Sequence, residues 1–150
     1  MLKTLLTLIK NPEAEVELGP EEAREAVAAI LVTAAHADDD YAESERAAID
    51  RILSARYGLD QAEARHLRAE GEAAHEAATD LVRFTQAVKR AVPHEERIAV
   101  IEAVWEVAYA DGDRDHTESA LVRRLCGLLY VPDREAGEAR RRVAARRGEG

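Results

Sequence analysis

Two matching groups of carboxylates are the residues of this sequence whose types and spacing best suit chemistry. Each group reads Asp-x-Asp-x-x-x-x-Glu, and the groups consist of Asp38, Asp40 and Glu45 and of Asp111, Asp113 and Glu118. In an extended loop the two aspartates share a side, and a glutamate in the first turn of the next helix can reach back toward them. Three converging carboxylates make a hard-oxygen site suited to Ca²⁺, Mg²⁺ or Mn²⁺. We therefore predict a candidate divalent-cation site in each group.

Helix capping is the alternative explanation of the same residues. Gly112 suits a helix C-cap, and the segment 115–118 has the spacing of a capping box. Capping explains neither Asp40 nor Asp113, so both interpretations stay open. The second group is the better cation candidate, because Asp39 stands where that group has its glycine.

Other reactive residue types do not assemble into a catalytic pattern. The five histidines match no recognised motif, and the sequence has neither a nucleophile elbow nor a glycine-rich phosphate loop. Cys126, the only cysteine, occupies the same place in an apolar pattern as Leu53, which predicts a core residue. We expect that the protein is not an enzyme.

Helical periodicity predicts the elements that position the acidic groups. A helix is expected to open at Pro20, and another is expected to end at Gly58. Asp60 and Glu63 have the spacing of a capping box at the start of a third helix. Further helices are expected from Thr79–Asp80 to a point before Pro93, from Glu95 toward the second acidic group, after that group, and after Pro132. With no convincing alternating strand pattern, we predict an all-α fold, a single compact bundle of about seven to eight helices.

An internal duplication relates the two acidic groups. A shift of 73 residues lays Ala35–Asp40 on Ala108–Asp113, and it also lays Glu45 on Glu118 and Tyr57 on Tyr130. We expect two similar helix–acidic turn–helix units.

Length and charge limit the classes of partner. The chain has 150 residues and a net charge of −9, which argues against binding nucleic acid. We divide it into an N-terminal apolar segment and linker (1–19), a helical domain (20–147) and a flexible C-terminus (148–150). The apolar stretch from Leu2 to Ile9 is too short to span a membrane. We expect it to dock on the bundle, with peripheral membrane contact or formation of a homodimer as alternatives, and we expect a cytoplasmic protein.

A family resemblance rests on the same acidic residues. The run Ala110–Asp113 with Glu118, and the degenerate copy Ala37–Asp40 with Glu45, resemble the duplicated signature of the TerB-like family, which is associated with tellurite resistance. The segments 80–85 and 121–125 resemble the stand-alone bacterial branch of that family. The similarity extends from about Glu21 to Arg147.

The resemblance implies a helical bundle in the bacterial cytoplasm and a link to metal or tellurite stress through complexes near the membrane. It also implies that the six acidic positions bind divalent metal. We expect a non-enzymatic helical module that binds a divalent cation at its acidic turns and acts through protein partners, some of them membrane-associated. The alternative is a metal-free adaptor for protein–protein interaction whose turns are only helix caps.

Overall fold

Helices account for nearly all of the regular structure in the described part of the chain. The computed structural model describes residues 2–11, 13–36, 41–78, 80–109 and 116–146, and for residues 2, 116–121 and 133 only the backbone. In chain order the elements are α1 (Leu2–Lys10), α2 (Pro20–Ala35), α3 (Glu43–Tyr57), α4 (Gln61–Ala77), α5 (Leu81–Ala91), the 3₁₀ helix η2 (His94–Glu96), α6 (Arg97–Ala108), α7 (His116–Leu128) and α8 (Asp133–Arg146). The predicted all-α bundle is confirmed, and within the described ranges there is no strand.

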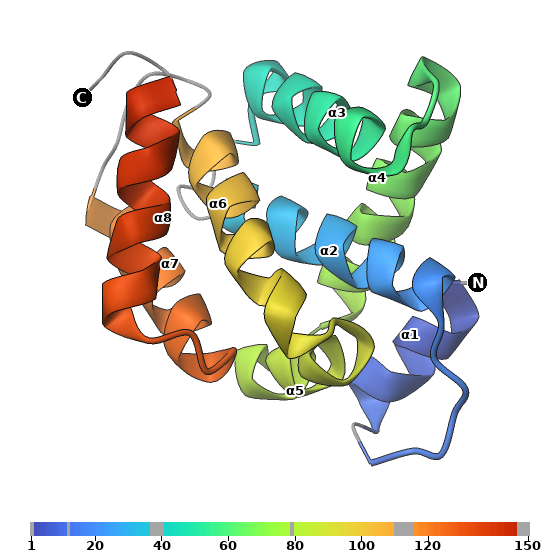
Figure 1. The fold of residues 1–150 in the computed structure, drawn as a ribbon. Helices are drawn as coiled ribbons and strands as arrows, with labels where there is room; N and C mark the ends of the chain where they lie inside the picture. The colour runs from blue at the N-terminus through green and yellow to red at the C-terminus, as the bar shows by residue number, and fades with distance from the viewer. Residues whose placement is uncertain (1, 12, 37–40, 79, 110–115, 147–150) are drawn as a thin grey trace.

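The bundle is built around α2, which contacts α1, α3, α4, α5, α6 and α7 (Figure 1). Every residue of α2 from Glu25 to Ala35 is buried. A helix that is buried on all sides needs small side chains where its neighbours come closest. At the crossing of α2 and α4, a Cβ atom placed on Gly71 would lie only 2.7 Å from the carbonyl carbon of Ala28. Alanine and glycine therefore allow these two helices to touch through their backbones.

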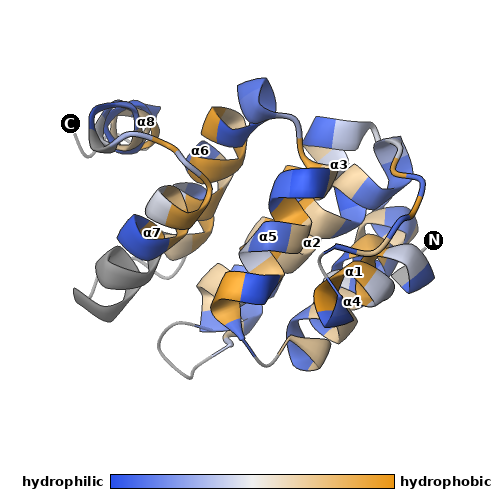
Figure 2. Ribbon diagram, turned by 90° about the horizontal axis from the view of Figure 1, so that it is seen from below, coloured by the Kyte–Doolittle hydropathy of each residue, from blue (hydrophilic) through white to orange (hydrophobic). Residues whose placement is uncertain are grey.

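The flanking helices close the bundle on opposite sides. The predicted docking of the N-terminal segment is confirmed, because α1 packs on α2, α4 and α5 and buries Leu5, Leu8 and Ile9. On the other side α8 packs against α6 and α7. Figure 2 shows that α6 is largely hydrophobic whereas α8 is mostly hydrophilic. Helix α6 is therefore covered on several sides, while α8 presents a polar face outward.

The predicted helix caps are present in the structure. The Asp60 carboxylate accepts from the Glu63 backbone N–H at 2.8 Å, and the Glu63 carboxylate accepts from the Asp60 N–H at 2.9 Å. Asp80 caps α5 through the N–H of Val82 at 2.8 Å. Gly58 ends α3 in the left-handed conformation, with φ of 65°. These caps fix where the helices around the core begin and end.

The helix bounds bear out the internal duplication. Helix α2 ends at Ala35 and α6 at Ala108, and α3 begins at Glu43 and α7 at His116, so both bounds repeat with the shift of 73 residues. His36 and Tyr109 occupy equivalent places as the C-cap residues of α2 and α6. The two predicted acidic turns therefore lie at matching positions in the two units.

Candidate functional site

The first acidic turn lies between α2 and α3. Asp38 and Asp40 fall outside the described residues, but Glu45 is described and occupies the first turn of α3. Its Oε1 accepts a hydrogen bond from the backbone N–H of Ala42 at 3.0 Å, as a capping glutamate does. The Glu45 side chain is also buried, with 1% of the residue exposed. The structure therefore places a carboxylate inside the protein directly beside this turn.

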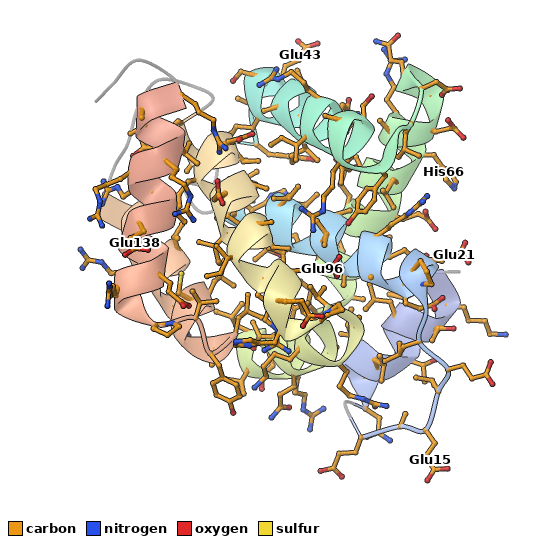
Figure 3. The ribbon with its side chains drawn as sticks, in the orientation of Figure 1. Glu15, Glu21, Glu43, His66, Glu96 and Glu138 are labelled. Carbon is orange, nitrogen blue, oxygen red and sulfur yellow. The ribbon has the colours of Figure 1, made fainter. Side chains whose placement is uncertain are left out.

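Burial separates Glu45 from the other capping glutamates. In the described part of the chain, the carboxylates of Glu22 and Glu63 make the same backbone contact at the starts of α2 and α4. Glu63 is exposed and Glu22 is partly exposed. The labelled residues Glu15, Glu21 and Glu43 also point away from the bundle in Figure 3. Capping alone therefore does not require the burial found at Glu45.

Aromatic rings flank the first acidic turn on both sides. His36 precedes it and Tyr41 follows it, and their ring centroids are 4.4 Å apart. The His36 ring also stacks on His75 of α4, at 4.4 Å and an interplanar angle of 28°. His75 Nδ1 lies 3.0 Å from the Thr33 hydroxyl of α2. Burial, together with the charge of His36, lowers the pKa of His75.

Tyr41 also connects the turn to an ionic network on α4. Its hydroxyl donates to Glu72 Oε2 at 2.6 Å, and burial and this carboxylate raise the pKa of Tyr41. Arg68 donates to the same Glu72 oxygen at 2.9 Å and to Asp50 of α3 at 2.6 Å. The guanidinium of Arg46 lies over the Tyr41 ring at 4.6 Å. The network joins the start of α3 to α4, so the C-terminal side of the turn is held against two helices.

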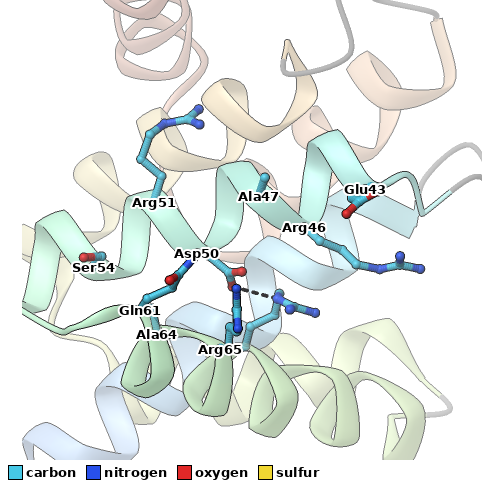
Figure 4. Close-up of a pocket in the computed structure, with 10 residues that line it drawn as sticks. Glu43, Arg46, Ala47, Asp50, Arg51, Ser54, Gln61, Ala64 and Arg65 are labelled. Atoms are coloured by element: carbon cyan, nitrogen blue, oxygen red, sulfur yellow. Dashed lines mark hydrogen bonds and ion pairs between the residues drawn. The ribbon is translucent and has the colours of Figure 1, made fainter.

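A pocket of about 620 Å³ lies between α3 and α4, close to this network. Figure 4 shows that its wall carries Arg46, Arg51 and Arg65. The lining also includes Asp50 and Arg68, which form an ion pair at 2.6 Å. Glu43 is a second acidic residue of the lining. Carboxylates and arginines are therefore mixed in this pocket.

The second acidic turn follows α6. Asp111 and Asp113 lie outside the described residues, and Glu118 is placed by its backbone alone, in the first turn of α7. On the described side, Tyr109 is buried at the end of α6, and its hydroxyl accepts from Arg140 Nε at 3.2 Å. The Arg140 guanidinium also lies 4.7 Å from the Trp105 ring. Both aromatic residues are core residues, and α8 fixes them from outside.

The histidines, cysteines and carboxylates of the described residues contain no group of three or more that could hold a metal ion. That statement does not cover five of the six predicted ligands, because their side chains lie outside the described residues: Asp38, Asp40, Asp111, Asp113 and Glu118. Cys126 is buried in the core, as its pattern predicted. Sequence reasoning missed the stacking of His36 on His75, because it depends on how α2 crosses α4 and leaves no periodic signal.

The arginine-rich C-terminal helix makes contacts within the chain. Arg142 pairs with Glu102 of α6 at 3.3 Å, and Arg146 pairs with Glu106 at 2.9 Å. Both arginines are about half exposed, so these pairs add little stability. Their main consequence is to orient α8 along α6. Among the described residues, no helix is both long and apolar enough to cross a bilayer.

The comparison with known protein families agrees with this arrangement. The sequence matches the family described as tellurite resistance protein TerB over residues 24–141, which extends from α2 into α8 and includes both acidic turns. No curated protein and no solved structure matches the chain. The family match covers well over half of the sequence, and it agrees with the duplicated acidic signature and the helical bundle. The chain belongs to the TerB family.

Proposed function

We propose that this protein is a non-enzymatic helical module that binds a divalent cation at its acidic turns and acts through protein partners. The ligands would be Asp38, Asp40 and Glu45 in the first turn and Asp111, Asp113 and Glu118 in the second. An all-oxygen donor set of this kind favours Ca²⁺, Mg²⁺ or Mn²⁺ over softer metals.

The burial of Glu45 is the observation that carries this proposal. A carboxylate removed from water loses several kcal/mol of solvation, in order-of-magnitude terms, and needs strong compensation. The exposed Glu63 makes the same capping contact without that cost. Two aspartates, Asp38 and Asp40, precede Glu45 by seven and five residues in the sequence. A bound cation would compensate both the burial of the carboxylate and the repulsion among the three groups.

Cation binding would act on the angle between the flanking helices. His36 and Tyr41 hold the two sides of the first turn against α4. Neutralising the carboxylates between them would favour one arrangement of α2 and α3 over others. A partner that contacts these helices would then bind with an affinity that depends on the cation.

A metal-free adaptor is the second candidate. The 3.0 Å hydrogen bond from the Ala42 N–H to Glu45 is a complete capping contact without any ligand. In that case the turns only fix helix ends, and partner binding is independent of cations.

Titration calorimetry and thermal melts with Ca²⁺, Mg²⁺ and Mn²⁺ separate the two candidates. If the acidic turns bind a cation, the wild type should release or absorb binding heat and should have a higher melting temperature. In that case Asp38→Asn/Asp40→Asn and Asp111→Asn/Asp113→Asn should each lose part of both effects. Glu63→Gln is the matched control, since it alters a capping carboxylate outside the turns. A wild type that shows neither heat nor a melting shift supports the adaptor.

Membership of the TerB family motivates one further part of the proposal. We infer a cytoplasmic role in the response of a bacterium to tellurite or metal stress. A deletion strain complemented with the wild-type or the Asp111→Asn/Asp113→Asn gene tests this role. The proposal expects that growth in tellurite or excess metal is restored by the wild type alone.

A further inference from the structure

A second pocket, of about 510 Å³, lies far along α2 from the acidic turn. It opens where the start of α2, the end of α3 and the connection between α5 and η2 meet. Its volume falls within the range of about 300–1,000 Å³ that is typical of small-molecule sites. Its lining includes six apolar residues, of which Leu18, Ala23 and Pro93 are the more exposed and Val27, Ala91 and Val92 are buried.

The charge of this pocket is opposite to that of the whole chain. Lysine and arginine number 21 against 30 acidic residues in the sequence, yet five cationic residues and one carboxylate, Glu96, line the pocket. The cationic residues are Arg24, Arg56, Lys89, Arg90 and Arg97. Such a concentration of positive charge beside apolar lining residues is complementary to an organic anion.

Two of the arginines are held in place by a tyrosine. The guanidinium carbons of Arg24 and Arg56 lie 5.0 and 5.6 Å from the centroid of the Tyr57 ring. Arg56 Nε also donates to the Tyr57 hydroxyl at 3.2 Å, and burial raises the pKa of that hydroxyl. The two guanidinium groups therefore lie beside the same ring, and Arg56 keeps its two terminal nitrogens as donors for a ligand.

Neither guanidinium is held in a direct ion pair with a described carboxylate. Within the part of the chain that the structure describes, Arg24 and Arg56 form no ion pair, and Glu96 forms none either. Arg97 differs, since it donates to the backbone carbonyls of Lys89 and Val92 and so stabilises the end of α5. Arg97 contributes charge to the pocket, whereas Arg24 and Arg56 retain donors for a ligand.

We propose that this pocket binds a small organic anion. Its phosphate or carboxylate group meets Arg24 and Arg56, and its compact apolar body lies against Leu18, Ala23 and Pro93, which are the more exposed apolar residues of the lining. Guanidinium groups recognise both kinds of oxyanion through paired hydrogen bonds. A compact anion fits better than a nucleic acid or an anionic membrane, because the net charge of −9 repels extended polyanions outside the pocket.

Binding of phenyl phosphate and benzoate, followed by NMR shifts at constant ionic strength, tests the proposal. Inorganic phosphate and phenol, the two halves of phenyl phosphate, are tested separately. We expect saturable binding of at least one whole probe, and weaker binding of each half. Arg24→Gln/Arg56→Gln should weaken binding by about tenfold or more, the expected effect of losing charged hydrogen bonds. Ala23→Phe, which places a large side chain at a lining position and keeps both arginines, should also abolish binding.

Arg51→Gln/Arg65→Gln is the matched control. It removes the same charge from the pocket between α3 and α4 (Figure 4) and should leave the affinity unchanged. Circular dichroism establishes that each variant is folded. The proposal is overturned if neither whole probe saturates the wild type, or if the two double variants weaken binding equally. It is also overturned if anionic vesicles of phosphatidylglycerol bind and the small probes do not compete.

Discussion

The rings of His36 and Tyr41 lie 4.4 Å apart, centroid to centroid, on the two sides of the first acidic turn. One residue caps the end of α2, and the other precedes the start of α3. Their contact brings the ends of the turn together, and His75 and Glu72 anchor both rings on α4. The residues on both sides of the turn are thus held in a framework of aromatic contacts and a charged hydrogen bond.

Tyr41→Phe tests that framework. The substitution removes the hydroxyl that donates to Glu72 at 2.6 Å and leaves the ring in place. We expect the free energy of unfolding to fall by about 1.5–3 kcal/mol, since the acceptor is charged. Chemical denaturation at pH 7 measures it. Tyr130→Phe is the control, because Tyr130 is exposed and its ring stays over Lys89; a similar loss in both variants would contradict the assigned role.

His75 predicts a loss of stability in acid. Its pKa is lowered in the folded protein from 6.5, so the unfolded chain binds a proton more readily as the pH falls. The free energy of unfolding should therefore decrease below about pH 6.5. His75→Phe keeps a ring at this position and should flatten that part of the pH profile. His66→Phe changes an exposed histidine and should leave the profile unaltered.

The burial of Glu25 predicts that stability falls as the pH rises, which is the opposite pH dependence to that expected from His75. Burial, reinforced by the neighbouring carboxyl of Glu70, raises the pKa of Glu25 from 4.5 to about 8. The stability that the protonated folded form contributes is complete below pH 4.5 and is lost as the pH rises through 8. Glu25→Gln should therefore be more stable than the wild type at pH 8.5 and nearly equal to it at pH 4. Glu43→Gln, at an exposed site, is the control, and equal gains in the two variants would refute the assignment.

Gly71 should resist a substitution that usually stabilises a helix. Replacing a helical glycine by alanine commonly gains about 1 kcal/mol. At Gly71 the new Cβ would lie 2.7 Å from the backbone of Ala28, so we expect a loss of about 1–3 kcal/mol instead. Gly127→Ala meets no atom within 4 Å and should gain about 0.5–1 kcal/mol. Thermal unfolding of both variants measures the difference in sign, and a gain at Gly71 would contradict the close crossing of α2 and α4.

Local signals account for most of what could be predicted about the fold. The capping box of Asp60 and Glu63 and the left-handed Gly58 depend on residues a few positions apart, so they can be recognised directly in the sequence. The two similar helix–acidic turn–helix units were predicted from the repeat itself, and the structure has His36 and Tyr109 as their equivalent C-cap residues.

The surroundings of the acidic turn were less predictable. His36 meets His75, and Tyr41 meets Glu72, only because α4 crosses α2 and α3 at short range. The burial of Glu45 likewise depends on how α3 packs against α2, α4 and α6. The pocket at Arg24 and Arg56 is assembled from three separate parts of the chain, and no spacing in the sequence indicates it.

Mn²⁺ titration followed by NMR line broadening is the most direct test of the central claim, that the acidic turns bind a divalent cation. The paramagnetic ion broadens signals from nuclei close to its site. The cation module predicts selective loss of the signals of His36 and Tyr41 and of Tyr109, and their recovery with excess Mg²⁺ or Ca²⁺. It also predicts that Asp38→Asn/Asp40→Asn spares the first pair alone. Broadening that is spread over all exposed carboxylates, or that is unchanged in this variant, would contradict the claim.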